Sequence, residues 1–337
     1  MSKIAFQKAI MERNNAVDYA RTIAVLSIFL DHYCLTLSSP AFGYIGRFLG
    51  GTFNVVFLLI SAFLFGRRWR CNDNEPISFF PFILRRLLKL ACTLWPFMIG
   101  IFVCFLLVGQ HFSTKDVLLN LLFLNWFDKL PGCEHLWFIT MISFAYILFA
   151  VLSRRKIIRS IRNELFLFWV PFSIFAVAIE YILDKRGLPG YILLYFVLLA
   201  VIYRFGHEIL KIVSKISSTK LFLTIIIVNL ITIASLFNNS YELHRTYSYV
   251  LLSINGLLLF LGLMRVFEGS RTNKIVYTFS SFGFEVYLVH HPLTTGCLSV
   301  YHLTNSPLMA FVLIVLFTGV ISIPLHFLSM KLQKMVL

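Results

Sequence analysis

The sequence predicts an all-α, polytopic membrane protein with about ten transmembrane helices, and three observations support that fold class. Of the 337 residues, 59% are hydrophobic and only 13% are charged, and the mean hydropathy of +0.83 lies outside the range of soluble domains. The apolar residues also occur in long continuous runs. Finally, the strands of alternating polarity that a membrane β-barrel requires are not seen.

The apolar runs define the predicted spans in order, because a helix must cross the lipid in about 20 residues with its backbone polar groups paired internally. These spans are residues 17–37, 48–66, 86–108, 136–153, 165–183, 190–205, 221–237, 247–267, 275–297 and 306–330. The longest outer connection, residues 109–135, contains the run VLLNLLFLNWF (117–127), which is too short to span and predicts an interfacial helix. We expect one membrane domain over residues 1–337.

Lysine and arginine set the predicted orientation. With the N terminus inside, 23 of the 30 Lys and Arg residues fall in cytoplasmic segments, six fall in outer segments, and Arg21 lies within the first span. Basic residues accumulate on the cytoplasmic side of membrane proteins, so both termini are predicted to be cytoplasmic. Topology thereby explains the net charge of +15, and we expect a lipid bilayer but no nucleic acid among the partners.

Three classes of feature are not expected. The N-terminal stretch MSKIAFQKAIMERNN is polar, and the apolar run after it is too long for a cleavable signal peptide, so the first span should remain in the mature protein. The six cysteines show neither a disulfide framework nor zinc-ligand spacing, and no metal site is predicted. Phosphate loops, dinucleotide glycine fingerprints, GxSxG and HExxH are also missing from the sequence.

The stretch DYARTIAVLSIFLDHY (18–33) of the first span contains Arg21, Asp31 and His32. An ionisable residue at mid-helix costs at least ~2.5 to 3.5 kcal/mol in a bilayer, so each is a candidate functional residue. Arg21 lies about one turn from the cytoplasmic side, where its side chain could instead reach the interface. Arg21 and His32 should lie about 16 Å apart along the axis and on one face, at 1.5 Å and 100° per residue. Asp31 is rotated by 100° from His32 and need not share its pocket.

Three spans bring histidines to a similar outer depth. His32 lies in the outer half of the first span, His135 at the outer mouth of the fourth, and His290 and His291 in FEVYLVHHPL of the ninth, beyond Glu285 at mid-membrane. A lone buried histidine is more often a hydrogen-bonded packing residue. Three positions at matched depth favour a site instead, because a neutral imidazole is well suited to act as a general base on a hydroxyl.

The cytoplasmic end has a different chemistry. Arg85, Arg86 and Lys89 in FILRRLLKL (82–90) begin the third span and, with Arg21, would form a cationic mouth. Arginine suits phosphate because of its planar fork of donors, although the topology rule alone also predicts basic residues at this end. Together with the histidines, this favours a phosphorylated ligand that enters from inside, with the chemistry deeper in the membrane.

The arginine and histidine separated by ten residues, Arg21 and His32, resemble the signature of the acyltransferase family 3 membrane proteins. Four further stretches resemble the family in the right order: GGTFNVVFLLISAFLFGRR (50–68), FILRRLLKL followed by Trp95 and Pro96, HLWFI (135–139) and EVYLVHHPL (285–293). The resemblance covers nearly all ten spans. One departure is Ser61-Ala62 in the second span, where the family usually has Ser-Gly.

The resemblance implies transfer of an acyl group, usually acetyl, from cytoplasmic acyl-coenzyme A to a hydroxyl of a glycan or related acceptor at the bacterial inner membrane. It implies His32 as general base, Arg21 as its partner and His290 as the late histidine of the site. The family's Arg-x-Arg element is matched loosely, so the candidate residues for binding the donor are Arg21, Arg68, Arg70, Arg85, Arg86 and Lys89. The candidates for binding the acceptor are His135, Trp137, Glu285 and Asp31.

A proton-coupled transporter or flippase of a glycan or small molecule is the alternative, since intramembrane charges and histidines also line transport paths. No inverted repeat or pair of glycine-interrupted helices supports it. The sequence leaves open the identity of the acceptor, the length of the acyl chain, a covalent acyl-histidine and the oligomeric state. Acyl-coenzyme A is expected as a co-substrate and not as a permanently bound cofactor.

Overall fold

A computed structural model describes residues 14–72, 74–127, 129–154, 161–185, 192–237, 244–271 and 273–337. Every regular element in these ranges is helical, which confirms the predicted all-α class. The long helices are α2 (Asn15–Leu35), α3 (Pro40–Cys71), α4 (Phe79–Leu107), α6 (Trp137–Ser153), α8 (Val170–Lys185), α9 (Ile192–Val213), α10 (Ser218–Phe237), α11 (His244–Val266), α12 (Lys274–Thr294) and α13 (Pro307–Val336). The short ones are α5 (Thr114–Leu121), η1 (Glu134–Leu136), α7 (Ile161–Glu164), η2 (Leu165–Trp169) and η3 (Val300–His302).

A helix lies in each of the ten predicted spans, but the described residues contain seven helices that are long and apolar enough to cross a bilayer. These are α3, α4, α9, α10, α11, α13 and the segment Glu134–Ser153. The other three fall short for visible reasons: α8 has 16 residues, and α2 and α12 bury charged and histidine side chains. The count of ten spans and the orientation of the termini therefore stay predictions.

The interfacial helix predicted over residues 117–127 is shorter and begins earlier. Helix α5 starts after a capping box, in which the Ser113 hydroxyl accepts from the Asp116 N–H and the Asp116 carboxylate accepts from the Ser113 N–H. It ends at Leu121, and Phe123 has a positive φ of 64° that no helix continues. The prediction followed the apolar run and overlooked the capping signal in front of it.

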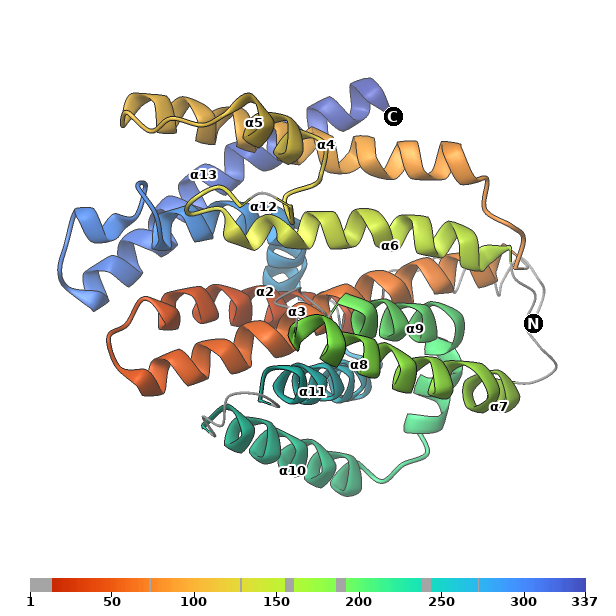
Figure 1. Cartoon of the computed structure of the whole chain (residues 1–337). Helices are drawn as coiled ribbons and strands as arrows, with labels where there is room; N and C mark the ends of the chain where they lie inside the picture. Colours follow the sequence, from red (N-terminus) through yellow and green to blue (C-terminus); the bar gives the residue numbers. More distant parts are fainter. Residues whose placement is uncertain are drawn as a thin grey trace.

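Helices α2, α3 and α12 form the centre of the bundle. Helix α2 packs along α3 and also against α12, and α12 packs against α13. Figure 1 shows α2 and α3, in red and orange, side by side. Gly46 and Gly50 let α3 approach α2, because a Cβ at either position would meet Asp31. Small residues four apart are a common device for close packing of membrane helices.

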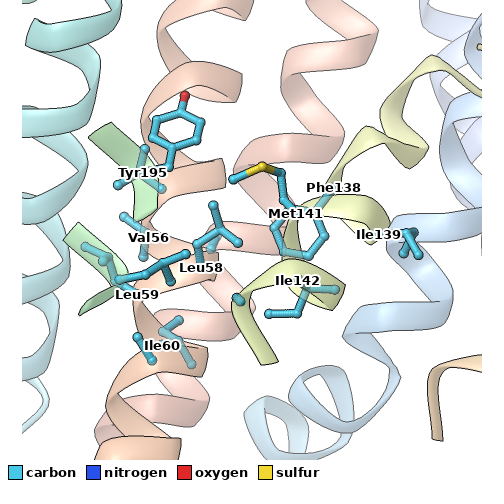
Figure 2. Close-up of a cluster of buried hydrophobic side chains, with 14 of the residues drawn as sticks. Val56, Leu58, Leu59, Ile60, Phe138, Ile139, Met141, Ile142 and Tyr195 are labelled. Carbon is cyan, nitrogen blue, oxygen red and sulfur yellow. The ribbon is translucent and has the colours of Figure 1, made fainter. Parts of the chain in front are cut away.

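The apolar core lies between α3, α6 and α9. Figure 2 shows Val56, Leu58, Leu59 and Ile60 of α3 beside Phe138, Ile139, Met141 and Ile142 of α6, with Tyr195 of α9 near the same cluster. Helices α10 and α13 are mostly exposed, and Figure 1 shows α10 at the edge of the bundle. Exposed apolar faces of this kind suit contact with lipid.

A buried ion pair joins α7 to α9. The Arg204 guanidinium donates to both oxygens of Glu164 at 3.3 Å, and both side chains are fully buried. Arg204 also lies over the Trp69 ring, and Arg70 donates to the Arg204 carbonyl and to Glu208. This network fixes the ends of α3 and α9 on the Arg21 side of the bundle.

Candidate functional site

Four imidazoles meet inside the bundle at one depth. His32 comes from α2, His135 from η1, and His290 and His291 from α12. The His32 ring centroid lies 4.9 Å from that of His290 and 4.3 Å from that of His291, and the His135 and His291 rings stack at 4.5 Å. His135, His290 and His291 are buried, while the His32 side chain keeps 13% exposure. The structure thus brings together the histidines that the sequence placed at matched depth.

Hydrogen bonds fix which nitrogen of His32 carries the proton. His290 Nδ1 lies 2.9 Å from the Val286 carbonyl, and because a carbonyl can only accept, Nδ1 of His290 must donate. In a neutral His290 ring, Nε2 is then an acceptor. It lies 2.7 Å from His32 Nδ1, which must donate in turn. The remaining nitrogen of a neutral His32, Nε2, therefore holds a lone pair and can take a proton.

Proline in α12 explains how His135 is held. Pro292 has no N–H, so it cannot bond to the Leu288 carbonyl one turn before it. His135 Nε2 lies 3.1 Å from that carbonyl and donates to it. His135 Nδ1 is then an acceptor, and it is buried without a hydrogen-bond partner in the structure. Its lone pair can accept a hydrogen bond from the hydroxyl of a ligand.

The loop before α6 holds the other histidine of α12. His291 Nδ1 donates to the Gly132 carbonyl at 2.9 Å, and Gly132 adopts a positive φ of 76° that favours glycine. The Tyr287 hydroxyl donates to the His135 carbonyl. The loop and α12 therefore fix each other. Among the described residues, no group of His, Cys, Asp and Glu is arranged to hold a metal ion.

Asp31 lies in the environment of His32, although its 100° rotation on the helical wheel did not require this. Its Oδ2 lies 3.6 Å from His32 Nε2, and Asp31 is 5% exposed. A helical wheel follows Cα directions only. In the structure the carboxylate occupies a notch over Gly50 of α3, where any Cβ would collide with it.

A second polar cluster lies towards the start of α2. Arg21 donates to the Ser280 hydroxyl at 3.2 Å, and Ser280 donates to Asp18 at 2.8 Å. Arg21 and His32 both contact α12, so they do lie on one face of α2. Glu285 is 3.0 Å from His326 Nδ1 on α13. His326 lies within the last predicted span, and nothing in its local sequence signalled this pairing.

Five of the six basic residues predicted to bind a donor are electrostatic neighbours in the structure: Lys89 of Arg21 and Arg86, and Arg86 of Arg68 and Arg85. Lys89 also lies close enough to Glu285 to interact electrostatically, and the Arg86 guanidinium stacks over Phe65 at 4.6 Å. Arg68 and Arg85 are exposed. Trp137 packs against Trp126 and Tyr195.

A cavity of about 800 Å³ opens at the Arg21 end of the bundle, between the start of α2 and the ends of α3, α9 and α11. Its basic lining residues outnumber its acidic ones and are Arg67, Arg70, His207, Lys211 and Arg265, against Glu208 and Glu268. Arg70 and Arg265 are engaged by the two glutamates. Of the six residues predicted to bind a donor, Arg70 lines this cavity. The sequence did not single out Lys211, because a basic residue near the cytoplasmic end of a helix is already expected from topology.

Comparison with known proteins agrees with the resemblance seen in the sequence. The family model for the acyltransferase domain of acyltransferase family 3 matches residues 14–327, which is nearly the whole chain. No curated protein and no solved structure matches the chain. The matched range includes both ends of the Arg21–His32 pair and the four clustered histidines. The chain therefore belongs to acyltransferase family 3 and is a multi-pass membrane acyltransferase.

Proposed function

We propose that this protein transfers an acetyl group from acetyl-coenzyme A to a hydroxyl of a cell-envelope glycan, with His32 as general base. The observation that carries the proposal is the chain of hydrogen bonds from Val286 through His290 to His32, which leaves Nε2 of a neutral His32 as a proton acceptor. A family of membrane acyltransferases supplies the reaction class. The proposed location is the bacterial inner membrane, with the Arg21 end facing the cytoplasm because basic residues gather there.

In the proposed reaction the chain supplies the base, and the two substrates supply the reacting groups. His32 Nε2 takes the proton of the acceptor hydroxyl as the hydroxyl oxygen attacks the thioester carbonyl. The carbon–sulfur bond of the tetrahedral intermediate then breaks. The leaving thiolate takes the proton back from the His32 imidazolium, so both the thiol product and the neutral base are regenerated.

The acceptor hydroxyl needs a second contact to align it. His135 Nδ1 offers a buried acceptor with no partner in the structure, and its ring centroid lies 6.2 Å from that of His32. A sugar with neighbouring hydroxyls can place one hydroxyl against His32 Nε2, while the next hydroxyl donates a hydrogen bond to His135 Nδ1. Such alignment converts a bimolecular reaction into an effectively unimolecular one.

The donor phosphates are proposed to bind in the basic cavity. Its volume of about 800 Å³ lies within the usual range for small-molecule sites. Lys211 and Arg67 line it, and basic side chains suit phosphate. Ala16 lines the cavity and His32 lies sixteen residues further along α2, a rise of about 24 Å, so the thioester arm must extend past Arg21 into the bundle.

The proposal is tested with purified protein in lipid nanodiscs, acetyl-coenzyme A labelled in its acetyl group, and an envelope-glycan fraction. Base-labile label on the glycan and one free thiol per acetyl group transferred are the expected results. A transporter would move the glycan through proteoliposomes without changing its mass. Glycan that stays unlabelled while the donor remains intact would contradict the proposed function.

A further inference from the structure

Asp31 places a buried carboxylate close to the nitrogen that acts as the base. Its Oδ2 lies 3.6 Å from His32 Nε2, which is too long for a hydrogen bond but short for two charges. Its Oδ1 is buried and has no hydrogen-bond partner in the structure. A carboxylate left in this condition inside a membrane protein is costly, and such residues usually serve a function.

The fold is shaped to keep the carboxylate there. Gly50 of α3 lies directly against it, and a Cβ at this position would overlap the carboxylate atoms. A Cβ at Gly46, one turn earlier, would lie 3.0 Å from the Asp31 carbonyl. The close contact of α2 and α3 therefore depends on glycine at the two places where Asp31 needs room.

The other groups that face His32 do not offer it negative charge. His135, His290 and His291 surround the ring, and each donates a hydrogen bond to a backbone carbonyl. When His32 takes the hydroxyl proton, it becomes a cation beside three imidazoles in a buried site. Only Asp31, among the groups whose contacts with His32 the structure describes, places a carboxylate near that cation.

We propose that Asp31 is a positioning residue that acts as the counter-ion of the His32 imidazolium during acyl transfer. The proton moves from the acceptor hydroxyl to His32 Nε2 and then to the leaving thiolate, and Asp31 keeps its own protonation state throughout. At 3.6 Å it stabilises the imidazolium without occupying the lone pair of the neutral ring. This inference rests on the proposed function and adds a reason for the acidic residue next to the base.

The test compares Asp31→Asn, which keeps the size of the side chain, with the wild-type protein. Without the carboxylate, kcat is expected to fall about 10-fold or more. Loss of the counter-ion lowers the pKa of His32, and each pKa unit is a factor of ten in the stability of the imidazolium relative to the neutral ring. The acidic limb of the kcat–pH profile is expected to move about 1 unit lower. The KM for the donor should stay unchanged, since Asp31 lies far from the basic cavity.

A second measurement does not depend on acyl transfer. Diethylpyrocarbonate modifies neutral imidazole, and peptide mass spectrometry can follow its reaction with His32 and with the exposed His302 across pH. In Asp31→Asn the midpoint for His32 should move to lower pH while that for His302 stays fixed. An unchanged His32 midpoint would overturn the inference, whatever happens to kcat.

Glycine variants cover the case in which Asp31→Asn does not fold. Gly50→Ala displaces the carboxylate and should also lower kcat, whereas Gly43→Ala on the same helix meets nothing within 4 Å and should not. The loss caused by Gly50→Ala should shrink in an Asp31→Ala background, which makes room for the methyl group. Full kcat in Gly50→Ala and in Asp31→Asn, with His32→Ala inactive, would refute the role of Asp31 and leave the proposed function standing. Full activity in His32→Ala would refute the proposed function itself.

Discussion

Replacing His290 tests the hydrogen bond that sets the protonation of His32. His290 is 1% exposed, and its Nε2 accepts from His32 Nδ1 at 2.7 Å. His290→Phe keeps an aromatic ring of similar size but removes the acceptor. His290→Gln offers an amide oxygen that can accept the same hydrogen bond, so it serves as the matched variant.

The size of the expected loss in kcat follows from the charge that His32, the hydrogen-bond donor, gains when it takes the proton. A hydrogen bond between neutral groups contributes about 1 kcal/mol, and one from a charged donor about 1.5 to 3 kcal/mol. The difference, about 0.5 to 2 kcal/mol, is gained only after His32 has taken the proton. Losing it should lower kcat about 2- to 30-fold in His290→Phe, with a smaller loss in His290→Gln.

The assay is the labelled acetyl transfer in nanodiscs, with kcat and the KM for the donor measured separately. We expect kcat to change and KM to stay within error, because the bond lies at the reacting end of the bundle. If His290→Phe were as inactive as His32→Ala, His290 itself would be the group that takes the proton. If His290→Phe kept the full kcat, the bond would not contribute to the proton transfer.

Three further predictions concern the frame of the bundle and the donor cavity. Gly66→Ala places a methyl group against a carbonyl of α9 and should lower the melting temperature in detergent, whereas Gly100→Ala, which meets nothing within 4 Å, should not lower it. Equal melting temperatures would contradict the close packing of α3 on α9. Glu164→Gln removes the carboxylate that faces the fully buried Arg204 and should cost about 3 to 5 kcal/mol of stability, seen as a clear drop in melting temperature. Lys211→Ala should raise the donor KM about 3- to 10-fold at unchanged kcat, from the loss of about 0.7 to 1.4 kcal/mol of phosphate binding; an unchanged KM would place the phosphates elsewhere.

The sequence was sufficient for the fold class and for the depth of the histidines. Hydropathy fixes where helices can cross lipid, and the period of 3.6 residues fixes which residues share a face. That is why His32, His135 and His290 were expected at one level and why Arg21 and His32 were expected to face the same neighbour. The family assignment also followed from the order of short motifs along the chain.

The details of the site depend on contacts that no local pattern contains. The position of the Asp31 carboxylate is set by Gly50, a residue on another helix that is nineteen positions away. The pairing of Glu285 with His326 likewise joins two helices. One signal was available in the sequence: Pro292 directly follows the two histidines, and a proline there frees the Leu288 carbonyl that His135 then uses.

The most direct test of the account is acetyl transfer by His32→Ala beside His302→Ala, an exposed histidine that lies outside the cluster. Both variants are purified in nanodiscs, checked for the wild-type melting temperature, and given labelled acetyl-coenzyme A with the envelope-glycan fraction. His32→Ala is expected to lose at least ~100-fold in kcat, while His302→Ala keeps the wild-type rate. Wild-type transfer by His32→Ala would contradict the role of His32 as general base.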